Sequence, residues 1–331
     1  MKCVKERINL AKEIPLQTPM ALMLEMSSAC NFKCKFCPVS DTEENKKHDF
    51  KYEFMNPELY KKAVDQFNDF PKTGNPFKVY INGIGESSYH PQFVELVRYT
   101  TEKLKRADAF IIRTNASLLT PDVVDEIIDA GMSEINISVE AVNEEGYEKV
   151  TGRKGMFQKV LDNVTYLYNH RGKCRVYAKI IPLGTPETDE KEFFRIFTPI
   201  TDIREVEYVM NWGGVEKDLT GGVKKPEITV NGDPITPNIT CPYIFYTIMV
   251  NASGIVHNCC FDPFTYVNVG DINKNTLQEI WNGEKLKAFW RLHLEGKRYG
   301  LRACGPCTYL YGCPDFLTEK DRLEILERLK D

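Results

Sequence analysis

Three cysteines at positions 30, 34 and 37 form the pattern in this sequence that is best suited to chemistry. They stand in the run Cys30-Asn-Phe-Lys-Cys34-Lys-Phe-Cys37, with three and then two residues between them. Thiolates at this spacing can surround one metal centre, but a closed structural zinc site needs four ligands and no fourth cysteine lies nearby. Three thiolates on a four-iron cluster would leave one iron open, and such clusters reach potentials low enough for demanding one-electron reductions. The run therefore predicts a reactive iron–sulfur centre.

The run resembles the signature of the radical S-adenosylmethionine (SAM) enzymes, in which an aromatic residue, here Phe36, precedes the last cysteine. It follows the first strand-like run, Ala21–Met26. The resemblance implies that Cys30, Cys34 and Cys37 hold a [4Fe-4S] cluster whose free iron binds SAM. An electron from such a cluster cleaves SAM and gives a 5′-deoxyadenosyl radical, which takes a hydrogen atom from the substrate. The alternative is a chance cysteine run of structural or zinc-binding type.

A glycine-rich turn ends the second predicted strand, in Asn82-Gly83-Ile84-Gly85-Glu86. Glycines let a backbone approach a ligand closely, and exposed carbonyls with a carboxylate can receive an ammonium group. The turn is similar to the family's Gly-Gly-Glu motif, although Ile84 splits the pair. The resemblance implies that Gly83, Gly85 and Glu86 hold the amino group of SAM, and an ordinary tight turn is the alternative.

Polar residues also end the next two predicted strands. The resemblance implies that Asn115, Ser138 and Glu140 contact SAM. For Glu140 the physical reason is that a carboxylate can accept hydrogen bonds from two ribose hydroxyls, as in dinucleotide sites. Arg153 could pair with the carboxylate of SAM, or it could be a solvated surface arginine. Each motif alone is ordinary polarity at a strand end, and their shared position on successive strands favours binding.

Alternating apolar runs and amphipathic stretches predict parallel βα units from residue 21 to 212. The six predicted strands are Ala21–Met26, Phe77–Asn82, Ala109–Thr114, Glu134–Val139, Arg175–Ile181 and Glu205–Met210. The helices predicted between them are Pro57–Phe70, Pro91–Lys105, Pro121–Ala130, Met156–His170 and Asp189–Phe197. Six strands are too few for a closed eight-stranded barrel. We therefore expect an α/β fold with a partial (β/α)6 TIM-type barrel, whose chemistry lies at the C-terminal ends of the strands.

A second set of cysteines lies beyond residue 240 and resembles the SPASM extension of the same enzymes. The similarity rests on C-x12-G-x4-C around Gly254 and on a later C-x2-C-x5-C. The full extension expects a further cysteine where Leu317 stands. The resemblance therefore implies the shortened "twitch" version, with one auxiliary [4Fe-4S] cluster on Cys241, Cys259, Cys304 and Cys307. A four-cysteine zinc site is the alternative.

The same region contains two further cysteines and two tryptophans whose positions can be predicted. We expect Cys260 to point away from the cluster into packing, and Cys313 to be a spare ligand, a buried thiol or a hydrogen-atom donor. One helix is predicted over Thr276–Leu292, and Trp281 and Trp290 would lie on opposite sides of it, so only one should pack on the cluster region.

Composition and charge limit the partners and the cellular location that this chain can have. The 331 residues carry a formal charge of −4 and no long basic run, which argues against a nucleic-acid partner. No stretch reaches the ~20 apolar residues of a membrane span, and Met1–Glu13 is charged throughout, so we expect a cytoplasmic protein. The predicted segments are an arm (1–20), the barrel (21–212), a linker or covering loop (213–240), the auxiliary cluster domain (241–317) and a final helix (318–331).

The resemblance favours a radical SAM oxidoreductase acting on a polar small molecule. Twitch-containing relatives include dehydrogenases of sugar-like alcohols, so we expect oxidation of a sugar or aminocyclitol alcohol, with the auxiliary cluster accepting an electron. A flavodoxin- or ferredoxin-type donor would reduce the first cluster. Candidate catalytic residues are His90, which also fits a helix start, Trp212, which could stack on a sugar ring or lie in the core, and Cys313.

Three other functions stay open. The first is epimerisation, with Cys313 or Cys260 returning a hydrogen atom to the substrate. The second is peptide or protein modification, although relatives of that kind often carry an extra N-terminal domain that 20 residues cannot supply. The third is a non-catalytic iron or redox sensor, which would need no pocket for SAM.

Overall fold

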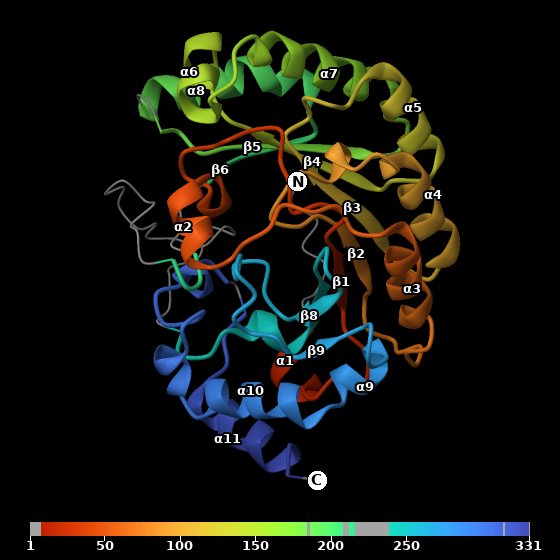
Figure 1. Cartoon of the computed structure of the whole chain (residues 1–331), viewed down its shortest axis with the longest axis vertical. Coiled ribbons are helices and arrows are strands. Elements are labelled where there is room, and N and C mark those ends of the chain that lie inside the picture. Colours follow the sequence, from red (N-terminus) through yellow and green to blue (C-terminus); the bar gives the residue numbers. More distant parts are fainter. Residues whose placement is uncertain (1–7, 184–185, 208–211, 216–237, 314, 331) are drawn as a thin grey trace.

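A nine-stranded sheet runs through the computed structural model, which describes residues 8–183, 186–207, 212–215, 238–313 and 315–330 (Figure 1). The strand order is β6-β5-β4-β3-β2-β1-β7-β8-β9. The strands are β1 (Ala21–Leu24), β2 (Lys78–Ile81), β3 (Ala109–Thr114), β4 (Glu134–Val139), β5 (Arg175–Ile180), β6 (Ile203–Val206), β7 (Thr247–Val250), β8 (Ile255–His257) and β9 (Gly270–Asp271). Most of the predicted linker, the start of the arm and the last three residues of the sixth predicted strand lie outside the described residues.

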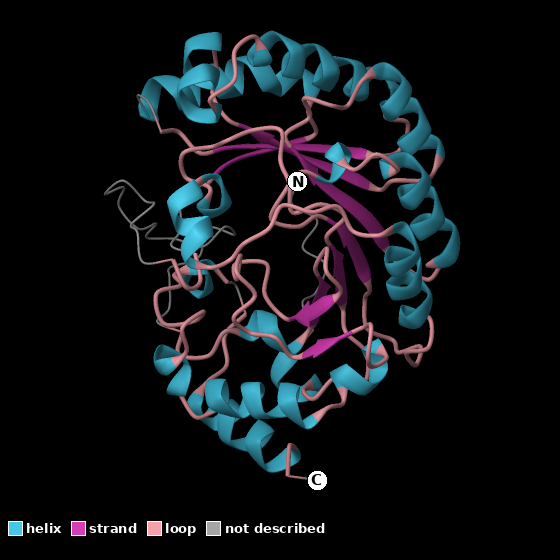
Figure 2. Ribbon diagram, viewed as in Figure 1, coloured by secondary structure: helices cyan, strands magenta, loops and turns pink. Residues whose placement is uncertain are grey.

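The first six strands form the predicted parallel array. Each strand from β1 to β5 pairs in parallel with the next one along the chain. Parallel neighbours need a crossover connection, and helices supply each of them. The helices between residues 57 and 197 cover the convex face of the curved sheet (Figure 2), which confirms the expected partial barrel.

Several helices begin at a side-chain cap. At α3, Asn56 accepts hydrogen bonds from the backbone N–H groups of Glu58 and Leu59, with Pro57 in the first turn. The α-helices are α1 (Leu10–Glu13), α2 (Thr42–Lys47), α3 (Pro57–Phe67), α4 (Phe93–Lys103), α5 (Pro121–Asp129), α6 (Glu144–Thr151), α7 (Met156–His170), α8 (Pro186–Phe197), α9 (Leu277–Trp281), α10 (Glu284–Leu294) and α11 (Glu319–Arg328). Short 3₁₀ helices are η1 (Pro38–Ser40), η2 (Ser87–Tyr89), η3 (Thr198–Ile200), η4 (Pro242–Phe245), η5 (Lys297–Gly300) and η6 (Tyr309–Gly312).

The two faces of the sheet differ in polarity because side chains alternate along each strand. On β4, Ile135, Ile137 and Val139 are buried, whereas Asn136 and Ser138 between them are partly exposed. The apolar set packs into the core beneath the helices. The polar set lines the opposite, concave face.

The C-terminal region joins the same sheet. Strand β7 pairs in parallel with β1 over four residues, from Ala21 with Thr247 to Leu24 with Val250. Strand β8 then returns antiparallel to β7 through a turn at Gly254, whose φ of +88° explains the glycine. The auxiliary region is thus attached to the barrel by a row of backbone hydrogen bonds.

The single helix predicted over residues 276–292 is wrong. The chain forms α9 and α10, which are separated because Asn282 ends the first helix and Gly283 takes an extended conformation. This break brings Trp281 and Trp290 together, with ring centroids 5.3 Å apart. Both side chains are fully buried and in contact with each other, so the expectation that they lie on opposite sides of one helix is also wrong.

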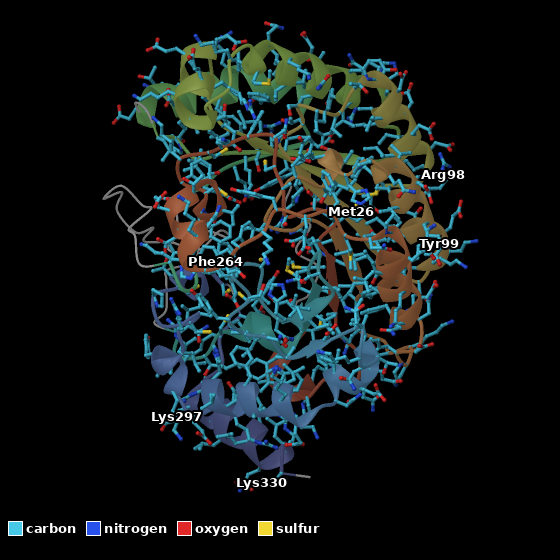
Figure 3. All side chains as sticks on the ribbon, in the orientation of Figure 1. Met26, Arg98, Tyr99, Phe264, Lys297 and Lys330 are labelled. Carbon is cyan, nitrogen blue, oxygen red and sulfur yellow. The ribbon has the colours of Figure 1, made fainter. Side chains whose placement is uncertain are left out.

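The outer helices carry a charged surface. Arg98 of α4 forms ion pairs with Glu126 and Asp129 of α5, and neighbouring Tyr99 donates to Asp65 (Figure 3). By contrast, Met26 lies near the centre of the molecule and is fully buried. Within the described part of the chain, every helix is too short or too polar to cross a membrane.

Candidate active site

Cys30, Cys34 and Cys37 lie on the loop that follows β1, at the C-terminal edge of the parallel strands. The loop is held by backbone hydrogen bonds from Lys33 to the carbonyl of Thr151 (2.9 Å) and from Lys35 to that of Val150 (3.0 Å). A turn closes it, since the Cys37 N–H donates to the carbonyl of Cys34 at 3.0 Å. The three thiols therefore sit on a fixed and partly buried loop.

The charge environment of this loop fits a metal centre. Burial raises the pKa of Cys30 to about 12, and burial also raises the pKa values of Cys34 and Cys37. The carboxylates of Glu86 and Glu140 add to the shift. Thiols in this setting stay protonated until a cation replaces their protons, as iron does when it binds.

The described thiols are not gathered around one ion. Throughout the described residues, no three side chains of histidine, cysteine, aspartate or glutamate converge as ligands of a single metal ion. A four-iron cluster holds its cysteines farther apart than one zinc ion does. The donor set of the loop, three cysteines and no histidine, is also the one that iron–sulfur clusters use.

Glu86 holds the site together from within. Its carboxylate accepts hydrogen bonds from the Ser88 N–H (3.0 Å), the Thr114 hydroxyl (2.8 Å) and the Asn115 N–H (2.8 Å). The Asn115 amide reaches Asn31 Oδ1 at 3.0 Å and Cys30 Sγ at 3.9 Å. Glu86 thus joins the ends of β2 and β3 to the cysteine loop, and most of its acceptor capacity is used by the protein itself.

The two glycines predicted to contact SAM are needed for close packing. A Cβ at Gly85 would lie 2.4–2.6 Å from backbone atoms of Ser27, Ser28 and Ala29, directly before Cys30. A Cβ at Gly83 would lie 2.2 Å from the side chain of Glu25. Both positions therefore set the path of the turn beside the cysteine loop.

The remaining predicted SAM contacts differ in their surroundings. Ser138 and Glu140 stand at the C-terminal end of β4, and Glu140 is buried near Cys34. Burial raises the pKa of Glu140 to about 7, against the opposing effect of Lys179. Arg153 is exposed, and its Nε donates to the Asn31 carbonyl at 2.9 Å, so it supports the cysteine loop from outside.

Cys241, Cys259, Cys304 and Cys307 come from three parts of the C-terminal region, and the last two and Cys241 interact electrostatically with Cys259. Cys241 precedes η4, Cys259 follows β8, and the other two lie on the loop after η5. Burial raises the pKa of Cys307 to about 12, and the other three cysteines of the set add to the rise at Cys259. These four residues would hold the auxiliary cluster.

A buried arginine stands beside this set. Arg298 is 1% exposed and donates to the backbone carbonyls of Cys304 and Cys307. Its charge favours the thiolate forms of Cys241, Cys304 and Cys307. A cluster held by four thiolates is negatively charged, so the guanidinium fits beside it.

The two spare cysteines face different neighbours. A hydrogen bond between the Cys313 and Cys241 thiols lowers the pKa of Cys241 and raises that of Cys313. Cys260 instead lies 3.6 Å from the Tyr243 hydroxyl, and burial raises the pKa of its thiol against the opposing charge of Arg113 on β3. Cys313 therefore lies beside Cys241 of the auxiliary set, and Cys260 adjoins the concave face of the sheet.

His90 and Trp212 have structural surroundings. His90 is buried, its Nε2 lies 3.0 Å from the Met55 carbonyl, and its Nδ1 accepts from the Gln92 N–H at 3.0 Å. Both ring nitrogens are used, which fits the helix-start interpretation. Trp212 packs against Phe261, with ring centroids 4.9 Å apart.

Two residues on or next to the strands were missed by the sequence prediction. Glu25 follows β1, is 4% exposed, and accepts from the backbone N–H groups of Ile84 (2.7 Å) and Ala252 (3.1 Å). Arg113 stands on the concave face, within the polar set described above. A charged residue inside an otherwise apolar strand run was the available signal in both cases.

Comparison with known families agrees with this geometry. The model of the radical SAM superfamily matches residues 24–196, and that of an iron–sulfur cluster-binding domain, SPASM, matches residues 241–308. The uncharacterized protein MJ0103 of Methanocaldococcus jannaschii is 30% identical over 182 residues, which are 53% of this chain and 40% of that protein. The chain matches only 31–40% of the length of three such curated relatives, MJ0103 included.

Solved structures share the fold. BtrN in complex with AdoMet (SAM) and 2-DOIA has a TM-score of 0.58 at 20% identity, covering 91% of this chain and 95% of BtrN. SuiB of Streptococcus suis, bound to its precursor peptide SuiA, has a TM-score of 0.65 at 14% identity, covering 92% of this chain and 73% of SuiB. At these identities the likeness concerns the fold alone. The family match, which covers more than half of the chain and includes the cysteine loop, shows that this protein belongs to the radical SAM superfamily.

Proposed function

We propose that this protein oxidises an alcohol group of a sugar or an aminocyclitol, with the auxiliary cluster accepting one electron. Membership of the superfamily implies SAM and a [4Fe-4S] cluster, and the SPASM match implies auxiliary iron–sulfur binding. When bound, these groups supply a radical that takes a hydrogen atom and a centre that takes the remaining electron. All further steps concern residues of the chain.

The observation that carries this proposal is the polar face between the two cysteine sets. Arg113, Asn136 and Tyr177 are adjacent in register across β3, β4 and β5. Cys260 interacts with Arg113 and directly follows Cys259 of the auxiliary set. A polar substrate on this face would lie beside the auxiliary region, which suits transfer of an electron to it.

Oxidation of an alcohol also needs a group that takes the hydroxyl proton. Glu205 of β6 stands beside Lys179 in the sheet register and accepts a hydrogen bond from the Tyr177 hydroxyl at 3.0 Å. Its neighbour Glu207 forms an ion pair with Lys179 at 2.6 Å. We assign Glu205 as the base. One hydrogen atom, one proton and one electron then leave the alcohol, and the product is a ketone or aldehyde.

The test uses anaerobically reconstituted protein with dithionite, SAM and a panel of 2-DOIA, myo-inositol and glucose. We expect 5′-deoxyadenosine and a product that lacks two hydrogen atoms. Cys30→Ala should form neither, whereas Cys259→Ala should still cleave SAM without completing the oxidation. Absence of SAM cleavage in the wild type would refute the function, and undiminished oxidation by Cys259→Ala would refute the role of the auxiliary set.

Epimerisation is a second candidate because the Cys260 thiol adjoins the same polar face. In that reaction the thiol returns a hydrogen atom and becomes a thiyl radical, which one electron from the reductant and one proton convert back to the thiol, and the substrate keeps its mass. In D₂O an epimerised product would gain one deuterium, and Cys260→Ser would stop the uptake. Loss of two hydrogens with no deuterium uptake would exclude epimerisation in favour of oxidation.

A further inference from the structure

We infer that Arg113 binds an oxyanion of the substrate and that Asn136 accepts a hydrogen bond from a neighbouring hydroxyl, so that the substrate carries a phosphate or carboxylate group in addition to its hydroxyls. This inference rests on the proposed function, because it places the substrate on the concave face of the sheet. It specifies a chemical class that the family match leaves open.

Arg113 is a cation for which the described residues supply no anionic partner. Among the residues that the structure describes, no carboxylate lies within ion-pair distance of its guanidinium, and no acceptor receives its hydrogen bonds. The residue as a whole is partly exposed. Its guanidinium lies 5.6 Å from the centre of the Tyr80 ring, a contact that orients it and uses no N–H group.

The carboxylates on the neighbouring strands are already engaged. Glu134 of β4 pairs with Arg175 of β5, and Glu207 pairs with Lys179. Glu205 accepts from Tyr177. Burial opposes the charge of Arg113, but nearby Cys260, Tyr243 and Tyr309 favour it and raise its pKa. The guanidinium is therefore charged, and it faces phenols and a thiol in place of an anion.

Asn136 supplies an independent observation. It is the register neighbour of Arg113 on β4. Its side-chain Oδ1 is buried and has no hydrogen-bond partner, an arrangement that is costly unless a ligand completes it. An unpaired acceptor next to an unpaired cation suits a group that offers a hydroxyl beside an oxyanion. Sugar phosphates and sugar acids both have this combination.

Arginine is well suited to this role because its planar fork binds phosphate and carboxylate with two parallel hydrogen bonds. Losing such charge-assisted bonds costs roughly tenfold to a hundredfold in affinity. An electron-rich oxyanion would also fix the orientation of the substrate carbon relative to Glu205. The subsite would thus set which alcohol is oxidised.

The experiment measures binding to the reconstituted protein with SAM by anaerobic calorimetry, using inorganic phosphate, glucose 6-phosphate, glucuronate and glucose. We expect both sugar anions to bind more tightly than glucose, and Arg113→Gln to weaken them by roughly tenfold to a hundredfold. Arg113→Lys should retain part of the affinity. Asn136→Ala should weaken the sugar anions more than it weakens phosphate. The comparison of glucose 6-phosphate with glucuronate tells phosphate from carboxylate.

Arg175→Gln is the matched control, because it removes a positive charge from β5 that is already paired with Glu134. It should leave anion binding unchanged. Iron content and far-UV circular dichroism establish that each variant is folded. Equal affinity of the wild type and Arg113→Gln for all three anions, or tighter binding of glucose than of either sugar anion, would overturn the inference. Anion binding through Arg113 in a protein that never cleaves SAM would defeat the proposed function and leave the subsite standing.

Discussion

The close packing of Gly85 against the cysteine loop makes a sharp prediction for Gly85→Ala. The added methyl group would lie 2.4 Å from the Ala29 carbonyl oxygen and 2.5 Å from that of Ser27. These are backbone atoms, so relief requires the loop itself to move. The Glu86 N–H also donates to the Ala29 carbonyl at 2.9 Å, which ties the two segments together.

We expect Gly85→Ala to lower the free energy of unfolding by about 1–3 kcal/mol, the usual cost of overpacking. The displaced loop should also bind its cluster poorly, with a loss of about four irons per chain after reconstitution. Urea unfolding of the metal-free protein measures the first effect, and iron and sulfide analysis measures the second.

Gly74→Ala is the matched control, since no atom lies within 4 Å of the position that its Cβ would take. It should leave the iron content unchanged and the free energy of unfolding within about 1 kcal/mol of the wild type. If Gly85→Ala were as stable and as rich in iron as Gly74→Ala, the argument from backbone contact would be refuted.

Three further predictions follow from buried polar groups. Burial raises the pKa of Glu25 from 4.5 to about 7, so folding takes up a proton between these pH values. The free energy of unfolding should therefore fall by about 3 kcal/mol as pH rises from 4.5 to 7. In urea unfolding, Glu25→Gln should lose this dependence of stability on pH, and an unchanged dependence would contradict the prediction. Trp281 donates to the Leu16 carbonyl at 2.8 Å, so Trp281→Phe should cost about 1–3 kcal/mol in urea unfolding, and a cost near zero would count against this bond. Arg298→Met should lower the reduction potential of the auxiliary cluster, since a buried positive charge favours the reduced form; an unaltered potential in an electron paramagnetic resonance titration would show that the charge has no such effect.

The barrel could be predicted from the sequence because its signals are local. Apolar runs such as Ala109–Thr114 and Glu134–Val139 match β3 and β4 residue for residue, and Met156–His170 matches α7. Helices α2 and α6 were missed because they are short and rich in charge. Their existence depends on caps, including Asp41 at the start of α2, and on contact with the cysteine loop.

The position of the cysteine loop at the edge of the sheet could be predicted, whereas the groups that support the loop could not. The cysteines could be named as candidate ligands because metal ligation fixes their spacing. The resemblance assigned Glu86 a contact with SAM. In the structure its carboxylate also joins the ends of β2 and β3. That contact could not be predicted, because it depends on a fold that brings distant residues together. The unpaired state of Arg113 could not be inferred at all. It depends on the fact that the carboxylates of the neighbouring strands already pair with other residues.

The pairing of β7 with β1 has a consequence for synthesis of the protein. Residues 21–24 leave the ribosome early, but their partners at 247–250 are made more than 220 residues later. At 5–20 residues per second, roughly ten to forty-five seconds pass in which one edge of β1 has no partner. An open strand edge next to three reactive thiols invites pairing with other chains. Expression at lower temperature, or with chaperones that shield strand edges, should therefore improve the yield of folded protein more than a larger supply of iron does.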